Sequence, residues 1–298
     1  IYKIASSLSA DVYHVHDPEL MFVGVLLGRK NRPVIFDAHE DLPKQILGKH
    51  YLSSPLKFIL SRCAGLLERL LCAKYSAVVC ATPYIRDKFL KYNENTIDIN
   101  NFPIIEEFNS GLDSREHSVN VVYVGAISRN RGIFELVRSL DNISSLRLNL
   151  VGKIKNDKFG RSLKRLSSWG KVNELGYLNR EEVNEIMSKS FAGLVTLHPI
   201  VNYLDALPVK MFEYMASGLP IIASNFPQWV EILEECKCGI AVDPLVPNAI
   251  EKAIVYLSEN RGDAKQMGMN GLKAVRKKYN WAIEEDKLLS LYRQVLRL

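Results

Sequence analysis

The sequence predicts an α/β protein made of two doubly wound domains, and three observations lead to this prediction. Short runs rich in β-branched and aromatic residues alternate with helical patterns along nearly all of the 298 residues. The alternation is interrupted by one polar stretch, EEFNSGLDSREHS at 106–118, and then starts again. A chain of this length has room for two domains of ordinary size. Alternating strands and helices build parallel sheets covered by helices, so each half is expected to be one such domain.

The first half, assigned to residues 1–110, contains four expected strands. They lie at residues 12–17, 34–40, 77–82 and 96–102. The opening segment, IYKIASSLSAD, has the pattern of the end of a helix, whereas a sheet of this kind usually starts with its own strand. We therefore expect the first domain to be incomplete at its start.

The second half, assigned to residues 116–280, repeats the same rhythm with six expected strands. They lie at residues 119–127, 146–152, 172–178, 192–199, 219–224 and 239–244. The loops that follow these strands are expected at one edge of a parallel sheet, which is where such sheets bind ligands.

One helix of the first half, at residues 56–75, has two interpretations. Its apolar residues form one helical stripe, and its cations lie elsewhere. The stripe comprises Leu56, Ile59, Leu60, Cys63, Leu66, Leu67, Leu70 and Leu71, and the cations are Lys57, Arg62, Arg69 and Lys74. The favoured interpretation is a helix that faces the core. The alternative is an amphipathic helix that binds a membrane surface near a lipid-linked substrate.

Composition restricts the class of protein and its partners. The chain is 47% hydrophobic and 24% charged, with a formal net charge of +6. This mild excess suits a phosphate-bearing small molecule or an anionic membrane surface, and it is too small and scattered for a nucleic-acid partner. Five cysteines, an odd number without paired zinc spacing, indicate reduced thiols. No run reaches the ~20 apolar residues of a membrane span and no signal peptide opens the chain, so a cytoplasmic location is expected.

The segment DALPVKMFEYMASGLP, residues 205–220, carries two charges at the start of an otherwise apolar helix. The strand before it ends near Pro199, and Pro208 is expected to be the first helical residue. Unpaired N–H groups at a helix start attract phosphate or hydroxyl groups, and Lys210 adds a full positive charge there. Glu213, one turn further, can accept hydrogen bonds from both hydroxyls of a ribose. The alternative for Glu213 is a salt bridge to Lys210.

This segment resembles the E-x7-E region of retaining GT-B glycosyltransferases of family 4, also called glycosyl transferases group 1. The resemblance implies that Glu213 holds the nucleotide ribose and that the preceding loop meets the donor sugar. The donor contacts implied there are Ala206, Leu207, Pro208 and Lys210, and Asp205 takes the catalytic place of the first acid although it is one methylene shorter. The resemblance further implies two Rossmann-like domains facing a cleft, with the final segment 281–298 crossing back towards the first domain.

Two other segments resemble donor-binding parts of the family. In VVYVGAISRNRGIFELVRSL, Gly125 allows close backbone approach, and Arg131 stands where the family usually has a lysine on the donor diphosphate. Ala126 replaces an arginine that many members carry, and Arg129 is the candidate to compensate. In NELGYL, the implied nucleobase contacts are Gly176, Tyr177 and Leu178.

The strand VIFDAHE resembles the family's strand that ends in the histidine facing the donor, which marks His39 as catalytic. Glu40 and Asp41 are expected to orient this histidine. The segment VYHVHDPEL offers rivals at the same kind of strand end, His14 and His16. On the acceptor side we expect His16, Asp17 and Glu40.

These features together predict a retaining glycosyltransferase that moves a sugar from a nucleotide diphosphate sugar, with UDP-sugar favoured, to a saccharide or lipid-linked saccharide. A role in bacterial surface polysaccharide synthesis and peripheral membrane contact are expected. No cofactor or metal is expected, since no Asp-x-Asp occurs and Arg131, Lys210 and helix-start amides can neutralise the departing diphosphate. Two alternatives remain, a nucleotide-sugar 2-epimerase on the same fold and a non-catalytic subunit that binds sugar nucleotides.

Overall fold

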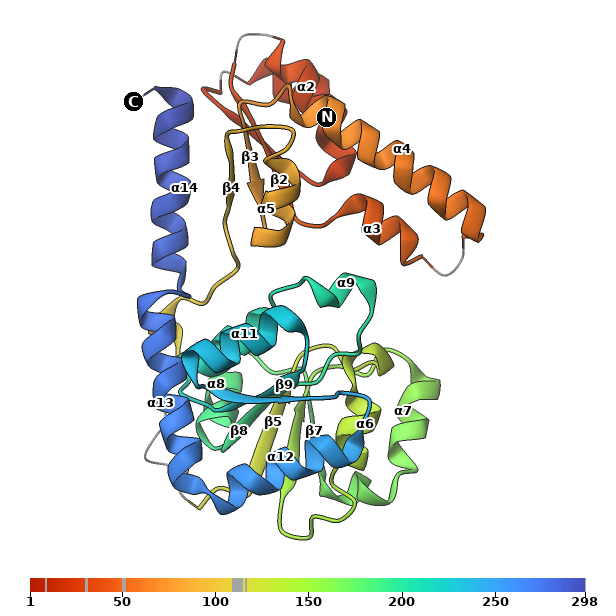
Figure 1. The fold of residues 1–298 in the computed structure, drawn as a ribbon, viewed down its shortest axis with the longest axis vertical. Helices are drawn as coiled ribbons and strands as arrows, with labels where there is room; N and C mark the ends of the chain where they lie inside the picture. Colours follow the sequence, from red (N-terminus) through yellow and green to blue (C-terminus); the bar gives the residue numbers. More distant parts are fainter. Residues whose placement is uncertain (9, 30–31, 50–51, 109–114, 116, 298) are drawn as a thin grey trace. The chain divides into compact units, whose positions relative to one another are not determined.

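The computed structural model describes residues 1–8, 10–29, 32–49, 52–108, 115 and 117–297, and the chain forms two compact α/β units. Unit 1 comprises Ile1–Asn101 and Trp281–Leu298, and unit 2 comprises Phe102–Asn280 (Figure 1). Each unit contains one sheet in which every strand pairing is parallel. The α/β prediction is therefore confirmed. The polar stretch 106–118 includes residues 109–114 and 116, which lie outside the described residues.

Unit 1 has a four-stranded sheet in the order β1-β2-β3-β4. The strands are β1 (Tyr13–His16), β2 (Val34–Ala38), β3 (Ala77–Cys80) and β4 (Thr96–Asp98), all at expected positions. The helices before and between them are α1 (Tyr2–Ser7), α2 (Met21–Gly28), α3 (Leu42–Leu47), α4 (Ser54–Cys72) and α5 (Pro83–Phe89), with a 3-10 turn at Pro18–Leu20. Every residue of β3 is buried, as expected for a parallel sheet covered on both faces.

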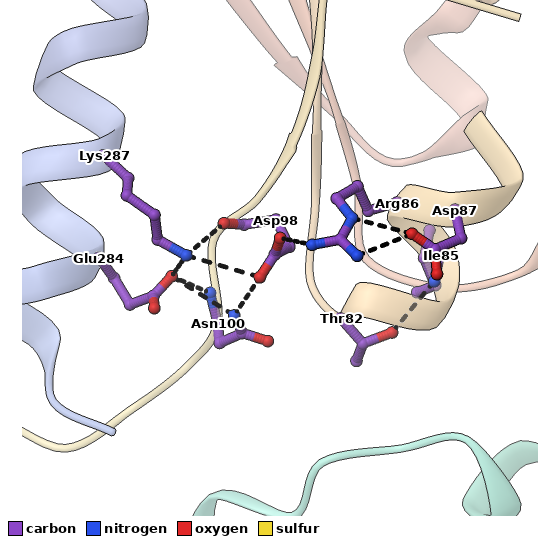
Figure 2. A network of polar contacts seen from close by, with 8 residues as sticks. All are labelled: Thr82, Ile85, Arg86, Asp87, Asp98, Asn100, Glu284 and Lys287. Atoms are coloured by element: carbon purple, nitrogen blue, oxygen red, sulfur yellow. Dashed lines mark hydrogen bonds and ion pairs between the residues drawn. The ribbon is translucent and has the colours of Figure 1, made fainter. Parts of the chain in front are cut away.

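The last helix, α14 (Trp281–Leu296), belongs to unit 1 although unit 2 precedes it in the chain. Its Leu291 is buried in a cluster with residues of β2 and β3. Figure 2 shows the polar network that joins α14 to the end of β4. Lys287 Nζ donates to the backbone oxygen of Asp98 at 2.8 Å, and Glu284 Oε2 accepts from the backbone N–H of Asn100 at 2.8 Å. Apolar packing and partly buried polar contacts thus bind α14 to this sheet.

Asp98 is the centre of that network. Its carboxylate accepts hydrogen bonds from Arg86 Nη1 at 2.7 Å and from Asn100 Nδ2 at 2.7 Å, and Lys287 Nζ lies 3.5 Å away. Burial alone would raise the pKa of this carboxyl, but the hydrogen bond from Asn100 and the two cations outweigh burial and lower the pKa. Asp98 is therefore ionised at neutral pH and joins α5, β4 and α14.

Unit 2 has a six-stranded sheet in the order β10-β9-β8-β5-β6-β7. The strands are β5 (Asn120–Val124), β6 (Arg147–Val151), β7 (Val172–Gly176), β8 (Ala192–Val195), β9 (Ile221–Ser224) and β10 (Gly239–Val242). The helices are α6 (Ile133–Arg138), α7 (Asp157–Lys164), α8 (Arg180–Ser188), α9 (Val201–Leu204), α10 (Val209–Ala216), α11 (Pro227–Cys236), α12 (Pro247–Glu259) and α13 (Arg261–Lys277). Short 3-10 turns lie at Ile105–Glu107, Arg129–Arg131 and Ser167–Lys171.

The core-facing interpretation of the 56–75 helix is wrong for most of its stripe. In α4 the buried residues are Ala64, Glu68, Leu71 and Cys72, which form one narrow face. The exposed residues of the stripe are Leu56, Ile59, Leu60, Cys63, Leu66, Leu67 and Leu70. The helix therefore has a second apolar face that unit 1 does not cover, because the small residue Ala64 and the ion-paired Glu68 fill the side that packs inward.

Candidate active site

The order of the strands in unit 2 points to one ligand-binding edge. The chain runs from β5 outward through β6 and β7, then returns to the other side of β5 with β8 and continues to β9 and β10. The direction reverses between β5 and β8, and open α/β sheets bind ligands beyond the carboxyl ends of the strands at this point. The loop that leaves β5 contains the predicted donor-binding residues of the 125–131 segment. The chain that leaves β8 passes through residues 205–208 into α10, which carries Lys210 and Glu213.

Gly125 and Lys210 meet at this edge. Lys210 Nζ donates a hydrogen bond to the hydroxyl of Tyr123 at 3.2 Å and lies 4.3 Å from the centre of that ring. A Cβ atom placed on Gly125 would lie only 2.6 Å from Nζ, and Gly125 has a φ of +134°. Glycine is therefore required both by the backbone conformation and by the space that the lysine occupies.

Burial, followed by the nearby Arg131, lowers the pKa of Lys210 to about 7. The amine is thus close to half protonated at neutral pH, and an anion placed beside it would favour the charged form. Arg131 itself lies over the ring of Tyr203, with 5.1 Å between Cζ and the ring centre. The structure places Arg131 close enough to Lys210 for its charge to lower the pKa of the amine.

Glu213 does not use Lys210 as its hydrogen-bonding partner, so the predicted alternative of a Lys210–Glu213 salt bridge is not what the described contacts show. Arg180 Nη1 donates to Glu213 Oε1 at 3.1 Å. Burial raises the pKa of the Glu213 carboxyl, and the charges of Arg180 and Lys210 partly oppose this. The sequence analysis missed Arg180, although its place directly after the NELGYL loop was a usable signal.

The side chain of Arg129 is largely exposed. Its guanidinium nitrogen Nη2 is 3.9 Å from Glu135 Oε1. The buried Glu135 also pairs with the ring of His198, with 2.9 Å between Nε2 and Oε2. His198 follows β8 and Glu135 lies in α6, so this pair lines the same edge of the sheet. The sequence analysis overlooked both residues.

The 205–208 loop is more structured than expected. A one-turn helix, α9, precedes it, and Asp205 caps the carboxyl end of α9. The backbone oxygen of Ala206 accepts a hydrogen bond from the indole of Trp229 at 2.7 Å, and Leu207 packs on the core of unit 2. Pro208 was predicted to be the first residue of the helix, but it is the N-cap residue, and α10 begins one residue later at Val209. Pro208, at the N-cap position of α10, makes no side-chain hydrogen bond to the first N–H groups of this helix.

The three predicted nucleobase contacts lie at the end of β7. Gly176 ends the strand with a φ of +68°. Tyr177 is 75% exposed, and Lys153 Nζ lies 5.4 Å from the centre of its ring. Leu178 is partly buried against the core of unit 2. An exposed aromatic ring beside a lysine is suited to stacking against a planar ligand.

In unit 1 the predicted catalytic histidine lies in a cluster around Asp37. The Asp37 Oδ2 atom is 3.5 Å from His39 Nε2, 3.1 Å from His16 Nδ1 and 3.7 Å from His14 Nε2. Burial, then the charges of His16 and His39, lower the pKa of His14 to about 4, so this ring is neutral at pH 7. Burial raises the pKa of Asp37, which the charges of His39 and His16 partly oppose. His39 and its two alternatives as the active-site histidine, His14 and His16, therefore lie in one cluster around Asp37.

The carboxylate beside His39 is Asp37, whereas the sequence analysis expected Glu40 and Asp41 in this role. Among the described contacts, Glu40 accepts a hydrogen bond from the amide of Gln45. Asp41 caps α3 and accepts from Lys88 Nζ at 2.9 Å. Asp17, expected on the acceptor side, is exposed and has a φ of +66° directly after β1.

Two α/β units, each built on a parallel sheet, are typical of the class of GT-B glycosyltransferases. In unit 2 the residues predicted to bind the sugar donor lie where the strand order of the sheet reverses. Comparison of the sequence with protein families gives two matches. Residues 105–274 match the family of glycosyl transferases group 1, and residues 1–99 match glycosyltransferase family 4. The chain belongs to the family of glycosyl transferases group 1 and is a glycosyltransferase.

Relatives and solved structures agree with this assignment. An uncharacterized glycosyltransferase of Methanocaldococcus jannaschii, MJ1607, is 22% identical over 97% of this chain and 76% of its own length. A sucrose synthase of Denitrovibrio acetiphilus is 29% identical, but over only 30% of this chain and 12% of its own length. Sucrose-phosphate synthase of Thermosynechococcus elongatus has a TM-score of 0.79 at 20% identity, covering 99% of this chain and 76% of that one. HepE of Anabaena in complex with UDP-glucose has a TM-score of 0.75 at 16% identity, covering 100% and 81%. The GT-B fold prediction is confirmed.

No described helix combines the length and the apolar character needed to span a membrane.

Proposed function

We propose that this glycosyltransferase retains the anomeric configuration and transfers a sugar from a UDP-sugar to a hydroxyl of a saccharide or lipid-linked saccharide in bacterial surface polysaccharide synthesis. The main support for a nucleotide-sugar donor is the group of Lys210, Arg131 and Glu213 near the place where the strand order of unit 2 reverses, between β5 and β8. The solved HepE structures contain UDP or UDP-glucose, which supports a uridine nucleotide as the first donor to test.

The side chains of unit 2 suit a nucleotide diphosphate without a metal ion. Lys210 and Arg131 supply positive charge, and the uncapped N–H groups of α10 add partial positive charge. These groups can neutralise the diphosphate as it leaves, so metal-independent transfer is proposed. Glu213, oriented by Arg180, can accept hydrogen bonds from the ribose hydroxyls. His39 is proposed to hydrogen-bond the donor sugar, and Asp205 to contact the same sugar.

A donor screen tests this proposal. UDP-, GDP- and ADP-sugars are added to the purified chain, and the melting temperature is measured, because a ligand that binds only the folded state stabilises it according to its concentration and affinity. UDP-sugars are expected to raise the melting temperature, and Glu213→Ala should reduce the rise at the same donor concentration. The donor that binds is then supplied with radiolabelled sugar to test transfer. Binding without transfer to any saccharide would favour a non-catalytic subunit, and a changed sugar released with UDP would favour an epimerase.

The exposed apolar face of α4 supports a membrane-bound acceptor. Leu66 and Leu70 are 58% and 56% exposed, and their neighbours Arg62 and Arg69 are exposed cations. The one acid of this helix, Glu68, is buried and paired with Lys88. An apolar face with basic neighbours and no exposed acid is complementary to an anionic lipid surface. We propose that this face rests on such a surface while the protein acts on a lipid-linked saccharide.

Vesicle sedimentation tests the membrane contact. The protein is expected to sediment with anionic vesicles in low salt and to detach as salt screens the attraction. Replacing both Leu66 and Leu70 by Glu should weaken binding by at least about tenfold, since each exposed leucine contributes on the order of 1 kcal/mol when inserted. The matched control is Leu245→Glu, an exposed leucine of unit 2. No sedimentation at low salt would instead indicate a soluble acceptor.

A further inference from the structure

Four side chains with nitrogen or oxygen donor atoms converge at the carboxyl ends of β1 and β2. His14 and His16 are two residues apart in β1, so their rings point to the same face of the sheet. In the parallel register His16 lies opposite Asp37 of β2, and His39 follows Asp37 by two residues. The pairs His-x-His and Asp-x-His therefore place all four side chains on one side.

The donor atoms have the spacing of a coordination sphere. The distances from Asp37 Oδ2 are 3.1 Å to His16 Nδ1, 3.5 Å to His39 Nε2 and 3.7 Å to His14 Nε2. The distance between His16 Nδ1 and His39 Nε2 is 3.3 Å. Ligands about 2.0–2.1 Å from a tetrahedral zinc ion lie about 3.3–3.4 Å from one another, because the edge of a tetrahedron is about 1.63 times its radius. The distances from Asp37 Oδ2 to His16 and His14 lie around this value, and the donor atoms of His14, His16 and Asp37 all lie within 4.8 Å of one another.

The orientation of His14 is a second, independent observation. Its Nδ1 atom is hydrogen-bonded to the hydroxyl of Tyr292 of α14 at 2.6 Å, which fixes the ring so that Nε2 faces the cluster. That Nε2 atom is buried and has no hydrogen-bond partner among the described residues. A histidine held at one nitrogen by a neighbouring group, with the other nitrogen aimed at further donors, has the arrangement of a metal ligand.

We propose that His14, His16 and Asp37 form a binding site for a divalent transition metal beside His39, with Zn²⁺ as the best match. Imidazole and carboxylate donors at tetrahedral spacing suit zinc, whereas Mg²⁺ and Ca²⁺ require more oxygen ligands. The metal site is inferred from the distances and hydrogen bonds of these residues and does not depend on the proposed function. Its consequence for activity rests on the proposed function: an ion at this site lies beside His39, whose Nε2 is 3.3 Å from His16 Nδ1, and competes with the donor sugar for this ring, so zinc inhibits a transfer that itself needs no metal.

Metal binding is measured first and without any substrate. The chelator-treated protein is titrated with Zn²⁺ by calorimetry, and metal content after dialysis is measured by mass spectrometry. One Zn²⁺ per chain is expected, with a Kd of about 1 μM or tighter. Asp37→Asn and His16→Ala should each weaken binding by more than about tenfold, and Tyr292→Phe by about tenfold, the scale seen when a group that orients a metal ligand is lost. Co²⁺ should give the intense visible absorption of tetrahedral coordination.

His117→Ala is the matched control, because His117 is an exposed histidine of unit 2 and should leave zinc binding unchanged. Circular dichroism of each metal-free variant verifies that it is folded. No stoichiometric uptake by the wild-type protein, or equal uptake by a folded Asp37→Asn variant, would overturn the metal site.

Transfer activity separates this inference from the proposed function. With one equivalent of Zn²⁺, transfer by the wild-type enzyme should fall and should recover when the metal is chelated. Binding with unchanged transfer would leave the metal site in place and contradict the role proposed for His39.

Discussion

The low pKa of Lys210 makes donor binding dependent on pH. Burial and the charge of Arg131 lower the pKa of this amine to about 7 in the free protein. The amine is then about 90% protonated at pH 6 and about 10% protonated at pH 8. If only the ammonium form binds the diphosphate well, affinity should fall about tenfold between these two pH values, because one proton must be taken up above the pKa.

The assay is calorimetric titration with UDP-glucose between pH 6 and pH 8.5. UDP-glucose is preferred to UDP because its diphosphate has no terminal phosphate group that titrates in this range. The heat should also depend on the ionisation enthalpy of the buffer above pH 7, which reports proton uptake directly. Lys210→Met should bind more weakly at pH 6 and show a flatter profile, since the titrating amine is absent.

Lys210 also makes the stability of the free protein depend on pH, but in the opposite direction: stability should rise with pH, whereas donor affinity should fall. Its folded-state pKa lies below its unfolded value of 10.5, so folding favours the neutral amine. Below pH 7 the folded protein must hold a desolvated charge, and stability from this group is gained as the pH rises from about 7 towards 10.5. Lys210→Met should therefore raise the melting temperature at pH 6 while weakening donor binding. Wild-type affinity that is constant from pH 6 to pH 8.5, or a variant with the same profile as wild type, would refute this reasoning.

Three further predictions follow from the described contacts. Glu213→Ala should weaken donor binding about 30-fold, on the order of 2 kcal/mol for a charged hydrogen bond, and calorimetry should show this without loss of fold; a lowered melting temperature with unchanged affinity would mean that Glu213 serves only to hold Arg180. His39→Ala should lower turnover about 100-fold while leaving UDP affinity nearly intact, and the placement of the catalytic group is wrong if His16→Ala loses transfer and His39→Ala does not. Asp98→Ala should lower the free energy of unfolding by about 1–3 kcal/mol at pH 7, measured by urea denaturation. Because the folded-state pKa of Asp98 is lowered below 3.8, the difference from wild type should shrink as the pH falls below that value, and a difference that grows would contradict the ion-pair account.

The strand positions and the donor-binding segments could be predicted because they depend on local patterns. All ten expected strands are present, since runs such as AVVCAT are rich in β-branched residues and have the right length for buried parallel strands. The places of Gly125 and Lys210 followed from motifs at strand ends. Their mutual contact did not, because it needs β5 to pair with β8, the strand that precedes α10.

The partners of charged groups were the least predictable feature. Spacing in a helix left a salt bridge to Lys210 as the alternative role of Glu213, but the described hydrogen bond to Glu213 comes from Arg180 of α8. Likewise, Glu40 and Asp41 were expected to orient His39, but the carboxylate that lies 3.5 Å from its Nε2 atom is that of Asp37, two positions earlier in the chain. Side-chain partners are chosen by distance in space, which neighbours in sequence only partly reflect.

The sequence by itself determined the fold class, the strands and the chemical types present at the strand ends, because alternation, strand composition and turn residues act over a few residues. The tertiary structure decided which of these groups meet. It set His16 of β1 opposite Asp37 of β2 through the register of two parallel strands, and it placed Tyr292 from the last helix against His14. It also left most of the α4 apolar stripe exposed, since only one narrow face of that helix packs inward. Burial and contact between distant segments are properties of the packed chain, and local patterns do not contain them.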